Sequence, residues 1–464
     1  MAGGPGGGGR LDLPGQAVSY HAGVEPGRGG DEGRRNISLE EIEDAVVDGD
    51  SPISTGTAAA ALRHRTFRIV FFGAFASNIG SWMQNVVLGA YAYNTTHSSS
   101  FVGVIIFAQL GPALVLAPLG GLLADRLDRK KFLIALSIEQ LVFSLGVALV
   151  VRSSSPSQVL LVVMVALVGV GNALYAPTYS AILPGLVGRE DMPGAIALNS
   201  AQMNASRVIG PIIGSVAYHF VGPAWVFTGN AATYLFVIAA LMVVRLPALP
   251  KVARPAGHWR DLWAGVTTAR ADRIVGRCLV TVFIFSLLAL AFIGQMPVVA
   301  AHNLGINPKS SNYGILYASF GTGALVGAIS IGTVFSRTSK PMIVRVGLSG
   351  YALALTAFAL LRQATPAYFV VALVGAFYFA FITALNTTLQ AQLDDAVRGR
   401  VMALWIMGFG GTVALGNLLV GPVVAAVGIT SVLLFGAGVA LVLVWYADVR
   451  PLPRVVGFGV GLAP

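Results

Sequence analysis

The sequence predicts an all-α membrane protein with twelve membrane-spanning helices. Of the 464 residues, 55% are hydrophobic and only 11% are charged, whereas soluble domains carry about 25% charged residues. Apolar runs long enough to cross a bilayer as a helix, which takes about 20 residues, recur along the chain. The composition therefore excludes a soluble globular domain and indicates a polytopic membrane protein.

The apolar runs fall into two groups of six, separated by one long polar loop. We expect spans at residues 68–93, 101–124, 132–151, 158–182, 195–219, 224–245, 278–301, 312–335, 342–361, 367–390, 401–426 and 430–448. The expected domains are a cytoplasmic tail over residues 1–66, a six-helix bundle over 67–245, a linker over 246–277, a second six-helix bundle over 278–450 and a second cytoplasmic tail over 451–464.

Two segments outside the spans have a composition of their own. Residues 1–66 are rich in glycine and acidic residues and lack the apolar core of a signal peptide, so we expect a disordered tail, with the first span as the targeting signal. The linker carries Trp259, Leu262, Trp263 and Val266 at helical spacing. This pattern predicts an amphipathic helix on the membrane surface.

The distribution of positive charge predicts that both termini are cytoplasmic. From Arg63 onward, 22 Lys and Arg residues fall on the side of the first tail, against three, Arg152, Lys309 and Arg362, on the other side. Cytoplasmic loops carry such an excess. The net charge of +10 thus reflects topology and does not indicate a nucleic-acid partner. The lone Cys278 excludes an internal disulfide, and the histidine spacing gives no reason to expect a metal.

The two groups of spans are related by an internal repeat with an offset of 211 residues. This offset places Gly121 on Gly332, Asp125-Arg126 on Ser336-Arg337, Gly210-Pro211 on Gly421-Pro422, and Gln84 on Gln295. Agreement in three pairs of corresponding spans predicts two parallel pseudo-repeats. The acidic residue of the first copy is lost in the second, where Ser336 replaces it.

Several of these segments resemble motifs of the major facilitator superfamily. They are Gly121-x-x-x-Asp125-Arg126-x-x-Arg129-Lys130, Ser77-Asn-Ile-Gly-Ser-Trp-Met-Gln84, Asn204-x-x-Arg207-x-x-Gly-Pro-x-x-Gly214 and Arg398-Gly-Arg-Val-Met-Ala403. The last three are similar to the enterobactin-exporter-like branch, also called transmembrane secretion effectors. The resemblance implies alternating-access transport, usually proton-driven efflux of siderophores or drugs. One departure is Asp128, which stands where the loop motif usually has glycine.

The charged loop between spans two and three is the candidate gate. A carboxylate at the end of a span can meet loop cations and the free N–H groups of a neighbouring helix start, and such a contact favours one of two packings. The resemblance implies a gating role for the matching residues Gly121, Asp125, Arg126, Arg129 and Lys130. The alternative is a topogenic loop with static surface ion pairs, which contribute little.

Two charged residues are expected inside the membrane. Arg207 lies 12 residues into span five, roughly 18 Å deep at 1.5 Å per residue, where arginine is costly without a cavity or a partner. It could bind anionic substrate groups or pair with an acid, or be buried and satisfied by carbonyls and Asn204. Glu139, roughly 11 Å deep by the same rise, is a candidate proton carrier; the alternative is an interfacial glutamate.

The remaining candidates are uncharged. Gly210, Pro211 and Gly214 in span five allow close helix approach or a hinge. Gln84, Gln295 and Asn78 are candidate cavity residues, together with Asn172, and each could equally form hydrogen bonds between helices.

We therefore expect a monomeric transporter in the plasma (inner) membrane that exports a drug-like or siderophore-like small molecule by alternating access and proton antiport. Its partners would be the lipid bilayer and the substrate, with a proton gradient as energy source and no cofactor. The alternatives are an importer or symporter of a small solute, and a membrane sensor that does not transport. No catalytic or nucleotide-binding motif indicates an enzyme.

Overall fold

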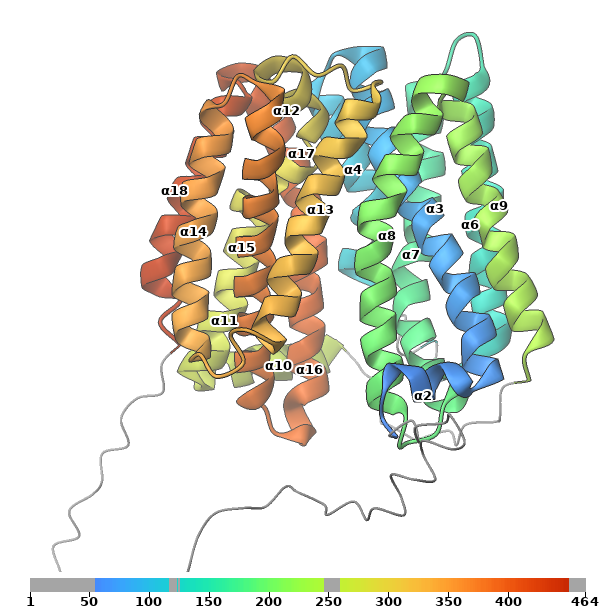
Figure 1. The fold of residues 1–464 in the computed structure, drawn as a ribbon, viewed down its shortest axis with the longest axis vertical. Coiled ribbons are helices and arrows are strands. Elements are labelled where there is room, and N and C mark those ends of the chain that lie inside the picture. Colours follow the sequence, from blue (N-terminus) through green and yellow to red (C-terminus); the bar gives the residue numbers. More distant parts are fainter. Residues whose placement is uncertain (1–54, 117–122, 124–125, 246–258, 450–464) are drawn as a thin grey trace, which may run out of the picture. The chain divides into compact units, whose positions relative to one another are not determined.

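The structure is a computed structural model, and it describes residues 55–116, 123, 126–245 and 259–449. The chain divides into two units, Met1–Ile53 and Ser54–Pro464. Every described residue belongs to the second unit, which Figure 1 shows as a bundle of long helices. The prediction of an all-α protein is confirmed.

The first half of this unit contains α2 (Ala58–Arg63), α3 (Arg65–Thr96), α4 (Ser99–Leu110), α6 (Arg129–Arg152), α7 (Gln158–Leu186), α8 (Met192–Val221) and α9 (Pro223–Val243). The second half contains α10 (Trp259–Ala271), α11 (Arg273–Ile284), η1 (Phe285–Ala289), η2 (Ala291–Ile293), α12 (Met296–Asn303), α13 (Ser311–Gly332), α14 (Lys340–Leu360), α15 (Ala364–Ala391), α16 (Asp395–Ile406), η3 (Met407–Gly411), α17 (Thr412–Val427) and α18 (Ile429–Tyr446).

Ten helical stretches among the described residues are long and apolar enough to cross a membrane. The helices α3 and α8 are not among the ten, although they have 32 and 30 residues, which corresponds to about 45 Å or more of helix. The chain is thus a multi-pass membrane protein, and the exact number of twelve spans remains a prediction.

The helix ends follow from local sequence. The side chains of Ser98, Asp128 and Ser157 each accept a hydrogen bond from a backbone N–H in the first turn of α4, α6 and α7, which satisfies a donor that the helix leaves free. Asp128, the residue that departs from the loop motif, thus serves as the N-cap of α6.

Two tight turns have the same construction in the two halves. The helices α8 and α9 are joined through Gly222 at φ 86°, and α17 and α18 through Gly428 at φ 79°. Only glycine adopts such φ values without a steric penalty, and a glycine there ends one helix and starts the next within a single residue.

We call the end of the unit that carries α2, α10 and the segment 126–131 the basic end, and the end that carries α12 and the turns at Gly222 and Gly428 the far end (lower and upper in Figure 1). Within the first half α3 packs on α8 and α9, and within the second half α15 packs on α13 and α14. Between the halves, α4 contacts α17 and α8 contacts α13.

The linker and the seventh span differ in detail from the expectation. A helix does form in the linker, as α10, and it packs on α16. The side chains of residues 259–264, which include the aromatic face, lie outside the described residues. The seventh span begins at Arg273, five residues earlier than expected, because Asp272 accepts hydrogen bonds from the N–H groups of Ile274 and Val275. This span is also interrupted, by η1 and η2.

Candidate functional site

Arg207 of α8 lies at the interface between the two halves. Its guanidinium carbon is 5.0 Å from the centre of the Trp82 ring on α3 and 4.6 Å from that of Phe379 on α15. A cation held between two aromatic faces is attracted by both ring quadrupoles, most strongly where water is excluded. One ring comes from each half, so the arginine joins the two halves.

Most of the hydrogen-bonding capacity of Arg207 is unused. Its Nη1 donates to Asn204 Oδ1 at 3.4 Å, and this is the one acceptor found for its five N–H groups within the described part of the chain. The only ion pair among the described residues joins His64 to Asp191, so Arg207 pairs with no acid there. The guanidinium edge is therefore free to bind an anionic or carbonyl-bearing group.

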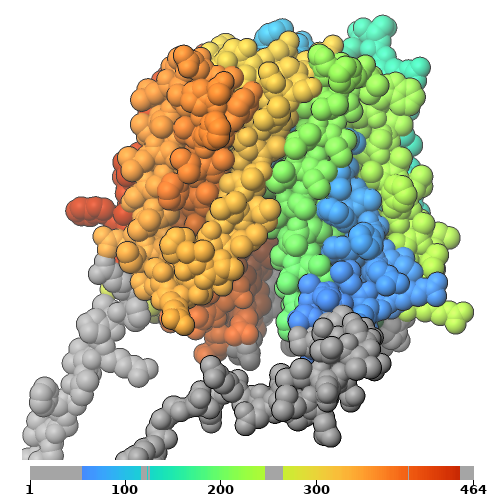
Figure 2. Space-filling model, in the orientation of Figure 1, coloured from blue at the N-terminus to red at the C-terminus, as the bar shows by residue number. Residues whose placement is uncertain are grey.

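The region between Arg207 and the basic end is polar and exposed. Asn204 Nδ2 donates to Ser200 O at 2.9 Å on α8, and Gln390 Nε2 donates to Asn386 Oδ1 at 3.2 Å on α15, both at exposed positions. Polar groups exposed within a span need water, because lipid cannot satisfy them. Figure 2 shows the surface hollowed between α8 and α13 toward the basic end. The site is thus accessible to water from this end.

Toward the far end the two halves are joined by direct contacts. Ser99 Oγ donates to Gly421 O at 2.7 Å, and Gln295 Nε2 donates to Ser99 O at 3.1 Å. Tyr93 Oη and His302 Nε2 lie 2.8 Å apart. Glycines bring the backbones together, since a β-carbon at Gly421 would lie 2.8 Å from the backbone of α4. These contacts close the site at the far end.

Gln84 and Gln295 are buried and form hydrogen bonds between helices. Gln84 Oε1 accepts from Asn230 Nδ2 of α9 at 2.8 Å, and Gln295 bonds the backbone of α4. Both glutamines thus form interhelical hydrogen bonds, and a role for them in a substrate cavity stays a prediction. Asn78 and Asn172 are half-buried. Neither side chain forms a hydrogen bond with another of the described residues.

Glu139 of α6 is half-buried and does not reach Arg207. Its Oε2 lies against Gly171 of α7 so closely that a β-carbon on that residue would overlap it. Glycine at this position therefore makes room for the carboxylate. Glu139 is enclosed within the first half, away from the interface where Arg207 lies.

Gly210 and Gly214 pack α8 against α3. A β-carbon on Gly210 would lie 2.6 Å from Trp82 Cβ, and one on Gly214 would lie 2.7 Å from Met83 Cγ. Pro211 is inside the helix, and its carbonyl lies close to Gly314 of α13. The motif therefore brings α8 close to α3 beside the ring of Trp82, which sets the position of Arg207.

The candidate gate lies partly outside the described residues, because Gly121 and Asp125 are not described. Arg126 is exposed. Arg129 Nη1 donates to Ala181 O of α7 at 3.1 Å, and Lys130 Nζ donates to Val244 O at 2.7 Å, just past the end of α9. Cations are favourable near the carbonyl ends of helices. The two cations therefore tie the start of α6 to its neighbours in the same half.

Two features of the site were not found from the sequence. Trp82 lies in the motif Ser77–Gln84, but its contact with Arg207, and the contact of Phe379 with Arg207, depend on how the halves meet.

The other feature is the ion pair of His64 and Asp191, with Nε2 and Oδ2 2.7 Å apart. The Gly56 N–H donates to Asp191 Oδ1 at 3.0 Å, and this bond and His64 lower the pKa of Asp191. They fasten α2 to the start of α8.

The chain matches a known protein family over most of its length. The model of a family described as transmembrane secretion effector matches residues 56–455. The enterobactin exporter EntS of Escherichia coli O1:K1 / APEC is 28% identical over 356 residues, which cover 74% of this chain and 81% of the exporter. The enterobactin exporter EntS of Shigella boydii serotype 4 (strain Sb227) matches to the same extent.

Solved structures share the fold. The nucleoside transporter NupG, in a mutant form, matches with a TM-score of 0.70 at 13% identity, over 83% of this chain and 100% of that chain. A bacterial homologue of the human lysosomal transporter Spinster, inward-facing and unoccupied, matches with a TM-score of 0.61 at 15% identity, over 82% and 95%. At these identities the likeness shows the fold alone.

Proposed function

We propose that this chain, which belongs to the transmembrane secretion effector family of the major facilitator superfamily, exports a small molecule by alternating access and proton antiport. Membership of this family and the fold support a small-molecule membrane transporter, and they point away from an enzyme. The direction of transport, the coupling ion and the location in the plasma membrane with both termini cytoplasmic belong to the proposal, as does a monomeric state without cofactor or nucleic acid.

The observation that carries the proposal is the position of Arg207. The residue bridges the two halves through Trp82 and Phe379, and it lies between the closed far end and the polar space at the basic end. A substrate entering from the basic end would meet the free guanidinium edge and the two rings. Export then requires the contacts of α4 with α17 to open while the basic end closes, which a rocking of the two halves provides.

This site favours substrates with an anionic or strongly polar group beside a planar ring. The guanidinium offers paired donors to the polar group, and Trp82 and Phe379 offer aromatic faces for the ring. The relatives' name, enterobactin exporter, is the reason to include siderophore-like molecules among the candidates. Proton coupling would use Glu139, whose carboxyl group is enclosed in the first half.

The test is transport into inverted membrane vesicles with an imposed proton gradient and a panel of drugs and siderophore-like compounds. We expect gradient-dependent accumulation that a protonophore abolishes. Arg207→Gln should weaken accumulation of anionic substrates, most strongly at low substrate concentration, and Asp125→Asn should weaken it by loosening the gate. Glu139→Gln should leave binding intact but remove the dependence on the proton gradient. Arg152→Gln, which removes an exposed arginine at the far end, is the matched control.

Other outcomes contradict specific parts of the proposal. Uptake by right-side-out vesicles and none by inverted vesicles would identify an importer. Correctly folded protein that transports nothing in either orientation would favour a sensor. The topology is tested separately by maleimide labelling of single cysteines at Ser154 and Arg337, because the native Cys278 is fully buried and does not interfere. The proposal expects label from outside the cell at Ser154 only.

A further inference from the structure

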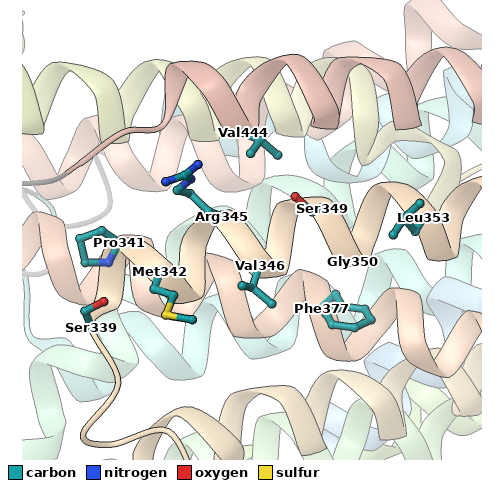
Figure 3. A pocket seen from close by; sticks show the side chains of 10 residues that line it. All are labelled: Ser339, Pro341, Met342, Arg345, Val346, Ser349, Gly350, Leu353, Phe377 and Val444. Carbon is teal, nitrogen blue, oxygen red and sulfur yellow. The ribbon is translucent and has the colours of Figure 1, made fainter.

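A groove runs along the outer surface of the second half, beside α14 and between α15 and α18. It encloses about 1180 Å³, and Figure 3 shows the side chains that line it. The hollow arises from small residues, since Ser349 and Gly350 lie between the larger Val346 and Leu353 on α14. A β-carbon on Gly350 would lie 2.5 Å from the Phe377 ring, so that ring forms the floor of the groove.

Most of the lining is apolar and exposed. Met342, Val346 and Leu353 are 58%, 53% and 69% exposed. In water, an exposed apolar patch of this kind would be a surface for association with another molecule. On a membrane-spanning helix, such a face contacts lipid instead. The apolar part of the groove is therefore open to the hydrocarbon region of the bilayer.

One end of the groove is cationic. Arg345 is exposed and lies beside Ser349, and its side chain extends toward Val444 of α18 (Figure 3). It makes no hydrogen bond or ion pair with any residue in the described part of the chain. An arginine on a lipid-facing surface is costly unless it reaches the headgroup level or a partner. This arginine is thus a free cation at the edge of an apolar groove.

The depth of Arg345 matches the lipid headgroups. It lies five residues after the start of α14, about 7.5 Å along the helix. Trp445, next to the lining residue Val444, is 89% exposed, and exposed tryptophans are typical of the membrane–water interface. The cationic end therefore lies near the interface, and the apolar part of the groove extends toward the bilayer centre.

We propose that this groove binds one anionic phospholipid. The phosphodiester binds the Arg345 guanidinium, whose planar donors match phosphate oxygens, with the hydroxyl groups of Ser339 and Ser349 nearby. One acyl chain lies over Gly350 against Phe377 and Leu353. The complementary charge selects an anionic lipid, because the ammonium group of phosphatidylcholine would be repelled by the same arginine. Basic sites beside membrane helices recognise anionic headgroups in this way.

The test is native mass spectrometry of the purified full-length chain, titrated with phosphatidylglycerol or with phosphatidylcholine of the same acyl chains. We expect one tightly bound phosphatidylglycerol and weaker binding of phosphatidylcholine. Arg345→Gln should weaken phosphatidylglycerol binding by about tenfold, the loss of one hydrogen-bonded charge. Ser349→Leu fills the hollow while keeping the arginine, and should weaken binding of both lipids. The matched control is Arg337→Gln, another exposed arginine at the basic end, outside the groove.

Three results would overturn the proposal. Equal binding of the two lipids by the native chain would mean that the groove holds ordinary bilayer lipid. Equal weakening by Arg345→Gln and Arg337→Gln would mean that general surface charge is responsible. A dimer that dissociates in Arg345→Gln, without a bound lipid, would assign the groove to a second copy. None of these measurements depends on transport, so they are independent of the proposed export function.

Discussion

Gly103→Ala is expected to shift the chain from the form closed at the far end toward the form open there. A β-carbon on Gly103 of α4 would overlap the carbonyl oxygen of Asn417 on α17. The backbone of a packed helix cannot yield as a flexible side chain does, so α4 and α17 must separate. Overpacking of this kind costs about 1–3 kcal/mol. The cost applies only to the closed form, because the two helices part when the far end opens.

A destabilisation of 1–3 kcal/mol confined to one form changes the ratio of the two forms by about 5- to 150-fold. We would measure this change as the distance between spin labels on Thr95→Cys and Val427→Cys, two exposed far-end positions on different halves. The buried Cys278 does not react. The distance distribution should move to longer values in Gly103→Ala.

The control is Gly438→Ala on α18, where a β-carbon would meet nothing within 4 Å. It makes the same chemical change in a helix without the clash. The reasoning is refuted if Gly103→Ala and Gly438→Ala give the same distance distribution as the unsubstituted chain, provided that thermal unfolding shows both variants to be folded.

Three further predictions concern other contacts. Arg207→Gln should raise the apparent KM for an anionic substrate by about 10- to 100-fold, which corresponds to the loss of a hydrogen bond to a charged group. Arg207→Lys should raise the KM less, because the charge remains. Transport rates measured over a series of substrate concentrations in vesicles give both values. Asp191, whose pKa is lowered in the folded chain, should hold α2 in place at neutral pH and release it as the pH falls through that lowered pKa. Hydrogen exchange of the α2 amides should therefore accelerate only in acid. In Asp191→Asn the exchange should be accelerated at every pH. Gly171→Ala should lower the stability by about 1–3 kcal/mol through overlap with the Glu139 carboxylate. In the double variant with Glu139→Ala, thermal unfolding should show that part of this stability is recovered. If none is recovered, the contact between Gly171 and Glu139 is contradicted.

The sequence predicts the long helices well and the interruption of the seventh span not at all. Span five was expected at residues 195–219 and is found as Met192–Val221, because length and apolar composition determine such a helix locally. The break before Gln295 depends on other helices. Tyr351 Oη donates to Ala289 O at 2.7 Å and Tyr317 Oη donates to Ile293 O at 2.8 Å. The Ala289 carbonyl would accept from Ile293 N–H in a continuous helix, whereas the Ile293 carbonyl has no such donor because residue 297 is proline. The proline is visible in the sequence, but the two tyrosines that satisfy these carbonyls come from other helices and are not.

The candidate site shows the same division. Arg207 stands out in the sequence because a charge deep in an apolar span is rare. Its partner Phe379 is one phenylalanine among the 24 in the chain, and only the meeting of two halves distinguishes it from the others. The loop cations Arg129 and Lys130 donate to carbonyls of α7 and α9. These partners follow from tertiary packing, and the gating role of the two cations stays a prediction.

The stacking of Arg207 on Trp82 has a practical consequence. The emission of an indole ring depends on nearby charge and on water, and Trp82 lies against a guanidinium that is also held by a ring of the other half. When the halves move or a ligand takes hold of the arginine, the surroundings of this one tryptophan change. With the other five tryptophans of the chain replaced by phenylalanine, the protein would report its own working cycle as a fluorescence signal, without any attached dye.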